Sequence, residues 1–273
     1  MSRSAPPRPR HHTPPRPTRA PRVALALAGG GPLGATFEIG ALCALADSLE
    51  GLDLNRLQHY VGVSAGGFVA AALANGITPR ELCDGFIAPS LGDDALFDPG
   101  ELMRPAYGEI GRRLAALPAL VAHACWQWAG RGQPLGRALE SLAPALPTGL
   151  LDNEAVHLQL QRLFEQPGHS NDFRQLSTRL TLVATQLDSG RDTPFGRAGW
   201  DHVPISRAVQ ASAALPGLFP PVEIDGQHYV DGALKKTVHA TVALDEGVDL
   251  LLCVNPLVPF DASATPAPLG PRI

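Results

Sequence analysis

The sequence is short of cysteines, aromatic residues and charged residues. Its 273 residues include four cysteines, while aromatic side chains make up 5% and charged side chains 18% of the chain. No C-x-x-C pair occurs, which argues against a cysteine-ligated metal site or a redox pair and favours a reducing compartment such as the cytoplasm. The net charge of −4 is small, so the overall charge gives no indication of binding to nucleic acid.

Long apolar runs are missing as well. The most apolar part of the middle of the chain, Ala115–Trp128, is shorter than the roughly 20 residues that cross a bilayer. It also contains Pro118 and His123. Because apolar stripes of this kind are usually core, we expect a buried helix here in preference to a lid that faces lipid.

The first 22 residues lack acidic side chains and apolar runs altogether. They hold six arginines and seven prolines, a composition that neither buries a core nor forms a helix, so we expect a disordered tail at Met1–Arg22. The tail lacks the apolar stretch of a secretory signal, and its prolines oppose an amphipathic transit helix. A solvated tail is the simplest interpretation, and peripheral membrane contact between its arginines and anionic lipid head groups is the alternative.

The remainder, residues 23–273, predicts one α/β domain, and its proline-rich end suggests that the natural chain continues. Apolar residues make up 45% of the chain, enough for a sizeable core. On the first expected helix, apolar residues recur every four positions from Phe37 to Leu49. Strands and helices alternate, as in a parallel sheet with crossover helices, before a late hairpin around Asp-Gly. The expected strands are Val23–Ala28, Leu57–Val63, Leu180–Gln186, Val222–Ile224, Gln227–Val230 and Leu250–Val254, and the early helices are Gly34–Glu50 and Ala65–Asn75.

A glycine-rich loop, Gly-Gly-Gly-Pro-Leu-Gly at Gly29–Gly34, joins the first strand to the first helix. Glycine lets the backbone approach a ligand closely, and the free N–H groups at a helix start attract an anion. That anion is either a dinucleotide pyrophosphate, since Gly29, Gly31 and Gly34 fit G-x-G-x-x-G, or the oxyanion of an acyl-transfer intermediate. The next strand ends in Ser64 and not in the acid that a ribose needs, which argues against the dinucleotide.

This serine lies in a second glycine motif. The segment Gly62–Gly66 matches G-x-S-x-G between an expected strand and an expected helix, which is the setting of a nucleophile elbow. Gly62 and Gly66 make room for a sharp turn, and the helix start offers the N–H of Ala65 as a further oxyanion donor. We therefore expect Ser64 to be a nucleophile.

A serine hydroxyl needs a base, and the residues alone leave two candidates. Asp231 ends the second strand of the expected hairpin and precedes Gly232, although Asp-Gly is also an ordinary turn pair. His239 lies late in the chain, where a Ser…Asp…His triad has its histidine. Spacing does not choose between them. No cluster of His, Cys and carboxylate side chains has metal-ligand spacing, so we expect neither a metal nor another cofactor.

Several segments between about Val23 and Val254 resemble the patatin-like phospholipase family. Three of them, Gly29–Gly34, Gly62–Gly67 and Asp231–Ala233, occur in the order and spacing of that family. The others are Leu182–Leu187 with the following Asp-Ser-Gly, and Ala211–Pro221.

The resemblance implies a three-layer α/β/α fold with a mostly parallel central sheet, and a Ser–Asp dyad without histidine. It makes Ser64 the nucleophile and Asp231 the base, with Gly29–Gly31 and Ala65 as the oxyanion hole. The implied substrates are acyl esters of lipids, hydrolysed without calcium. Leu33 departs from the Lys or Arg that the family often has there, and the Asn and Pro that typically follow the aspartate motif are replaced. The alternatives are an α/β-hydrolase esterase with a histidine triad and a dinucleotide-binding protein that uses the glycine-rich loop Gly29–Gly34.

Overall fold

The computed structural model describes residues 21–87, 105, 107–126 and 149–258. The tail expected at Met1–Arg22 lies outside the described residues except for its last two positions, and so does the proline-rich end of the chain.

The described residues form seven strands and several helices. The strands are β1 (Val23–Leu27), β2 (His59–Val63), β3 (Arg179–Gln186), β4 (Asp192–Phe195), β5 (Val222–Ile224), β6 (Gln227–Asp231) and β7 (Leu250–Val254). The α-helices are α1 (Gly31–Ser48), α2 (Ala65–Ala74), α3 (Pro79–Leu82), α4 (Tyr107–Cys125), α6 (Glu154–Phe164), α7 (Ile205–Ser212) and α8 (Ala240–Leu244). Shorter turns are the π-helical η1 (Cys83–Ile87) and the 3₁₀ turns η5 (Phe173–Gln175) and η6 (Gly232–Leu234).

All seven strands belong to one sheet. Its order is β5-β6-β3-β2-β1-β7, and β4 pairs with β3 outside this path. Strands β1, β2, β3 and β7 run parallel, while β4 and β6 are antiparallel to β3, and β5 is antiparallel to β6. The expected sheet with a parallel centre is confirmed, and so is the hairpin of β5 and β6, where Asp225 and Gly226 both have the positive φ of a type I′ turn.

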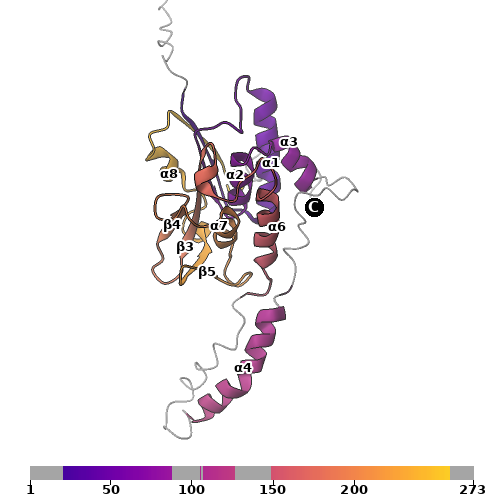
Figure 1. Cartoon of the computed structure of the whole chain (residues 1–273), viewed down its shortest axis with the longest axis vertical. Coiled ribbons are helices and arrows are strands. Elements are labelled where there is room, and N and C mark those ends of the chain that lie inside the picture. Colours follow the sequence, from indigo (N-terminus) through magenta and orange to yellow (C-terminus); the bar gives the residue numbers. More distant parts are fainter. Residues whose placement is uncertain (1–20, 88–104, 106, 127–148, 259–273) are drawn as a thin grey trace, which may run out of the picture.

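Alternate side chains of the central strands enter two separate cores, because successive residues of a strand point to opposite faces. On β1, Leu25 and Leu27 pack into the core that also contains residues of α1, α2, α6 and α7. Ala24 and Ala26 point to the other face, where Ala243 of α8 covers them. The sheet therefore lies between two layers of helices (Figure 1), which is the three-layer α/β/α fold expected from the sequence.

Helix α1 buries a different face from the one that the sequence suggested. Phe37 and Leu49, the ends of the expected stripe, are 55% and 45% exposed, whereas Glu38, Ile39 and Leu42 are fully buried. A strict step of four residues drifts by about 40° each time around a helix of 3.6 residues per turn. The buried face therefore follows alternating steps of three and four, which a search at one fixed spacing misses.

The helix expected to be buried at Ala115–Trp128 is exposed instead. It forms the second half of α4, where Leu117, Val121 and the nearby Trp126 keep 36%, 43% and 51% of their surface exposed. Figure 1 shows α4 standing away from the sheet. The expectation is wrong because an apolar stripe indicates which side of a helix is apolar but not whether another element packs against it.

Three aromatic side chains support the antiparallel part of the sheet. Phe195 of β4, Trp200 and Tyr229 of β6 contact one another edge to face, with ring centroids 5.2 to 6.0 Å apart. Phe195 and Tyr229 are fully buried. Since Tyr229 lies two residues before Asp231, this cluster holds the strand that ends in the expected base.

Replacing Phe195 by alanine should therefore lower the free energy of unfolding by about 3–5 kcal/mol, because it opens a cavity in this cluster. Phe37→Ala is the matched control, since its ring is 55% exposed, and it should change stability by about 0.5 kcal/mol or less. Urea unfolding followed by circular dichroism measures both variants. Equal losses in the two would contradict the packing described for Phe195.

Candidate active site

Strand pairing brings the ends of β2 and β6 to the same level of the sheet. Val63, the last residue of β2, pairs with Val183 of β3, and the next residue of β3, Ala184, pairs with Asp231. Ser64 follows Val63 directly. Two residues far apart in the sequence thus meet at one corner of the sheet.

Ser64 lies in a strained turn between β2 and α2. Its φ of 54° and ψ of −122° are uncommon for a residue with a side chain. Strain of this kind costs about 1–3 kcal/mol and persists where the surroundings enforce it, often at functional sites. The surroundings here are tight, because a Cβ on Gly62 would lie 2.6 Å from the carbonyl oxygen of Gly66, and one on Gly66 would lie 2.4 Å from that of Ala28. Only glycine fits at both positions.

Asp231 is buried beside this serine, with 3% of its surface exposed. Its Oδ1 accepts a hydrogen bond from the N–H of Ala233 at 2.8 Å, and the Ser64 side chain lies close enough to its carboxylate to influence its pKa. Burial raises the pKa of Asp231 above its ordinary value, and the N–H of Ala233 and the Ser64 side chain oppose that rise. A carboxylate with a raised pKa is a stronger base than one in water.

His239 contacts the backbone of the aspartate turn. Its Nε2 lies 3.5 Å from the carbonyl oxygen of Gly232, and its Nδ1 lies 3.8 Å from Oδ2 of Asp192. The ring is 2% exposed, and burial lowers the pKa of His239. Its position is that of a support for the turn after Asp231.

The glycine loop lies beside Ser64, since a Cβ on Gly29 would lie 3.3 Å from the Cβ of Ser64. Gly30 caps α1, Gly31 is its first residue with φ of 61°, and Ala65 is the first residue of α2. The first N–H groups of a helix have no partner inside it, and within the described residues these three donate to no other backbone group. Gly29 differs, since its N–H donates to the carbonyl of Thr237 at 3.1 Å. This engagement removes Gly29 from the expected oxyanion donors.

Ser212, the last residue of α7, connects the turn at Ser64 to strand β3. Its hydroxyl accepts a hydrogen bond from the N–H of Ser64 at 2.8 Å and donates one to the carbonyl of Val183 at 2.6 Å. Ser212 is fully buried. In the sequence Ser212 falls within a family-like loop, but nothing there indicates its role, since its partners lie on other elements.

Glu38 of α1 holds the start of the glycine loop, and nothing in the sequence pattern singled it out. Its Oε1 accepts a hydrogen bond from the N–H of Ala28 at 2.8 Å, while the carbonyl of Ala28 accepts one from Gly66 at 3.0 Å. Its other oxygen is buried without a hydrogen-bond partner in the described part of the chain. Burial raises the pKa of Glu38 from 4.5 to about 8, so the carboxyl is protonated at neutral pH.

This raised pKa predicts a specific pH dependence of stability. Between pH 4.5 and 8 the unfolded chain has lost the proton of Glu38 while the folded protein keeps it, so stability falls as the pH rises through this window. Glu38→Gln should remove that fall and keep an acceptor for Ala28. Urea unfolding from pH 5 to pH 8.5 measures how stability changes with pH. Glu50→Gln is the control, since Glu50 is exposed and lies just beyond the end of α1. Parallel curves for wild type and Glu38→Gln would contradict the assignment.

Neither a metal cluster nor a membrane-spanning helix occurs in the described residues. No group of three or more His, Cys, Asp or Glu side chains there is arranged to hold a metal ion. None of the helices in the described ranges is long and apolar enough to cross a bilayer.

Comparison with known proteins finds distant relatives. An uncharacterized protein of Acanthamoeba polyphaga mimivirus is 23% identical over 82% of this chain and 62% of its own length. An uncharacterized NTE family protein of Mycobacterium tuberculosis is 32% identical over 30% of this chain and 21% of its own length. This chain therefore spans less than two thirds of the curated relatives it matches.

Solved structures with some similarity include two bacterial proteins. VipD from Legionella pneumophila aligns with a TM-score of 0.44 at 20% identity, over 85% of this chain and 48% of VipD. ExoU of the Pseudomonas aeruginosa type III secretion system, solved in complex with SpcU, aligns with a TM-score of 0.36 at 20% identity, over 74% of this chain and 39% of ExoU.

The family comparison covers most of the chain. The family model described as patatin-like phospholipase matches residues 25–244, a range that contains both glycine motifs, Ser64 and Asp231. By this match, and in agreement with the resemblance of its motifs, the chain belongs to the patatin-like phospholipase family.

Proposed function

We propose that this protein hydrolyses acyl esters of lipids, with Ser64 as nucleophile and Asp231 as base. One observation carries the proposal: the Ser64 side chain, held in a strained turn at a helix start, lies beside the buried carboxylate of Asp231 and lowers its pKa. Family membership supports hydrolysis of a lipid as the reaction class.

In the first half of the reaction, Asp231 takes the proton of Ser64 as Oγ attacks the carbonyl carbon of the ester. The carbonyl oxygen becomes negatively charged and accepts hydrogen bonds from the N–H groups of Gly30, Gly31 and Ala65. The ester C–O bond then breaks, and the departing alkoxide takes the proton from Asp231. In the second half, Asp231 takes a proton from water, which attacks the acyl-serine and releases the fatty acid while the proton returns to Ser64.

The surroundings of Asp231 suit a base that works without histidine. A carboxylate in water is a weak base for a serine hydroxyl, because the two pKa values differ widely. Burial raises the pKa of Asp231, which narrows the difference. The N–H of Ala233 holds Oδ1, and this contact keeps the carboxylate in a fixed orientation toward Ser64.

Exposed apolar side chains near the site support a lipid substrate. Leu33, two residues after the glycine triplet, is 85% exposed, and Leu234 in the turn after Asp231 is 54% exposed. Leu257 is 52% exposed and follows Pro256, whose ring packs against Gly30. Apolar side chains left in solvent around a catalytic corner offer a surface for acyl chains.

Ser64→Ala should lower turnover of p-nitrophenyl esters by more than about 10³-fold and abolish labelling by a fluorophosphonate, because the nucleophile is lost. Ser189→Ala, in an exposed turn, is the matched control and should leave both unchanged. Mapping the labelled peptide identifies the reactive serine. Labelling that persists in the folded Ser64→Ala variant would overturn the role of Ser64.

Two substitutions test whether the site works as a Ser–Asp dyad or as a Ser–Asp–His triad. Asp231→Asn should reduce kcat about as far as Ser64→Ala does, since an amide takes up no proton. His239→Gln should keep kcat within about tenfold, because His239 contacts Gly232 and not the reacting groups. Steady-state kinetics on variants checked by circular dichroism gives both values. A folded His239→Gln protein as inactive as Ser64→Ala would favour the histidine triad.

Substitution in the glycine loop tests the oxyanion hole. A Cβ on Gly30 would lie 2.8 Å from Pro256 and 2.9 Å from Cα of Gly34, so Gly30→Ala must displace the loop. We expect kcat to fall by roughly 10²–10³ with a smaller change in KM, as for loss of one oxyanion donor. Gly40→Ala on the same helix meets no atom within 4 Å and serves as the control. A change in KM alone would indicate a loop that only binds the substrate.

A further inference from the structure

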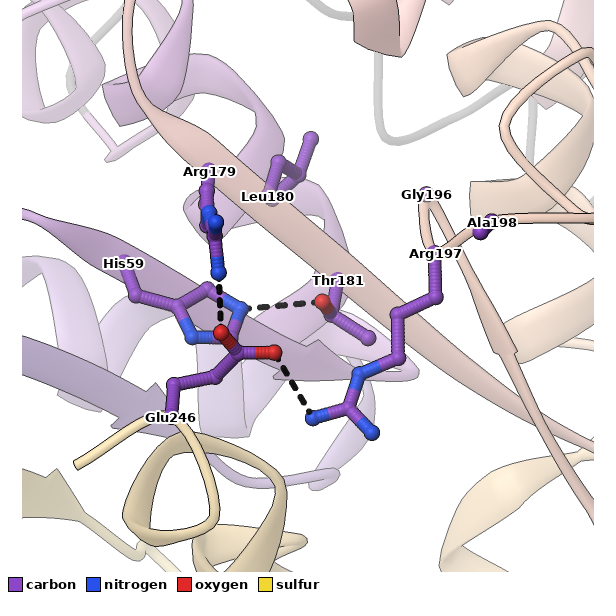
Figure 2. A pocket seen from close by; sticks show the side chains of 8 residues that line it. All are labelled: His59, Arg179, Leu180, Thr181, Gly196, Arg197, Ala198 and Glu246. Atoms are coloured by element: carbon purple, nitrogen blue, oxygen red, sulfur yellow. Dashed lines mark hydrogen bonds and ion pairs between the residues drawn. The ribbon is translucent and has the colours of Figure 1, made fainter.

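A cavity of about 540 Å³ is lined by residues of two strand starts and two loops (Figure 2). His59 at the start of β2 and Arg179–Thr181 at the start of β3 form one side, and the turn Gly196–Ala198 and Glu246 complete it. Ser64 follows the opposite end of β2, and five strand residues put about 16 Å between the two sites. The cavity is therefore separate from the proposed dyad, and ligand binding there is independent of the proposed function.

Two buried nitrogen atoms in this cavity have no hydrogen-bond partner among the described residues, Nδ1 of His59 and Nε of Arg197. His59 is 1% exposed, and its other ring nitrogen lies 2.9 Å from the hydroxyl of Thr181. A buried donor without a partner costs about 1–3 kcal/mol, so native proteins rarely keep one without a reason. Two such atoms in the wall of one cavity leave hydrogen-bonding capacity that a ligand in the cavity can use.

The cavity already stabilises one negative charge. Figure 2 shows the carboxylate of Glu246 between two guanidinium groups. Its Oε1 lies 3.3 Å from Arg197, and its Oε2 is paired with Arg179. Arg197 is held in place by a second bond, to the carbonyl of Val242 at 2.8 Å, while the side chain of Arg179 is 65% exposed at the mouth. Glu246 uses one nitrogen of each arginine and leaves the buried donors unused.

We propose that this cavity binds a small phosphate monoester, which displaces the carboxylate of Glu246. The monoester has three terminal oxygens, enough for Arg179, Arg197 and His59 together, whereas a carboxylate has two. The planar guanidinium fork matches phosphate oxygens. The cavity is larger than a phosphate group, which leaves room for the organic part of the ester.

The histidine is suited to donate one hydrogen bond to such a ligand. Burial lowers the pKa of His59 to about 4, so the ring is neutral at physiological pH and carries a single N–H. When the hydroxyl of Thr181 donates to Nε2, that hydrogen lies on Nδ1, the atom without a partner.

Isothermal titration calorimetry of the full chain with inorganic phosphate and with glycerol 3-phosphate tests the proposal. We expect saturable binding that Arg197→Gln weakens at least tenfold and that Glu246→Gln tightens several-fold by removing the competing charge. Arg179→Gln should weaken binding too, and its exposed position keeps this test valid if Arg197→Gln fails to fold. Arg162→Gln, exposed on α6, is the matched control and should bind as the wild type does.

Vesicles distinguish a lipid head group from a soluble ligand. The Ser64→Ala chain, which cannot hydrolyse lipid by the proposed route, is mixed with phosphatidylcholine vesicles with or without phosphatidic acid. Binding to soluble glycerol 3-phosphate identifies the ligand as a soluble ester. Binding only to vesicles with phosphatidic acid, and its loss in Arg179→Gln or Arg197→Gln, identifies the ligand as a lipid head group. The proposal is overturned if no probe binds saturably, or if Arg179→Gln and Arg197→Gln bind as tightly as Arg162→Gln.

Discussion

The close contact between Gly66 and Ala28 is the constraint on which the rest of the site depends. The N–H of Gly66 donates to the carbonyl of Ala28 at 3.0 Å, an approach that any side chain at position 66 would block. It places the start of α2 against the end of β1, so the nucleophile turn and the glycine loop share one corner. Glu38 holds the same residue from its other side by accepting a hydrogen bond from the Ala28 N–H. Each element of the proposed oxyanion hole is positioned by this junction.

The two ends of β2 are proposed to carry different chemistry, and the geometry of the sheet gives a reason. In a parallel sheet, helices begin beyond the carboxyl ends of the strands, so free N–H groups gather there and favour a developing negative charge. At the amino ends, Arg179 begins β3, and the segments that follow β4 and α8 bring Arg197 and Glu246 beside the buried His59. The first end suits the transient oxyanion of an acyl transfer, and the second suits a stable anion.

The errors made from the sequence have a common origin. The apolar segment Ala115–Trp128 was interpreted as core and is largely exposed where described, and the four-residue stripe from Phe37 to Leu49 does not mark the buried face of α1. In each case the residue pattern was local, while burial depends on which other element arrives at that surface. The hairpin around Asp225 was predicted correctly because its register depends on the backbone angles of two adjacent residues.

The sequence by itself determined the turns of this protein, because local sterics allow few residue types in them. Gly62 and Gly66 on either side of Ser64 indicated a sharp turn between strand and helix, and the structure contains it. Only the tertiary structure decided what each turn faces. Pairing of β6 with β3 brings Asp231 to Ser64 and leaves His239 on the carbonyl of Gly232. Partners of that kind come from segments far apart in the chain, and the residue types alone do not indicate which distant strands pair.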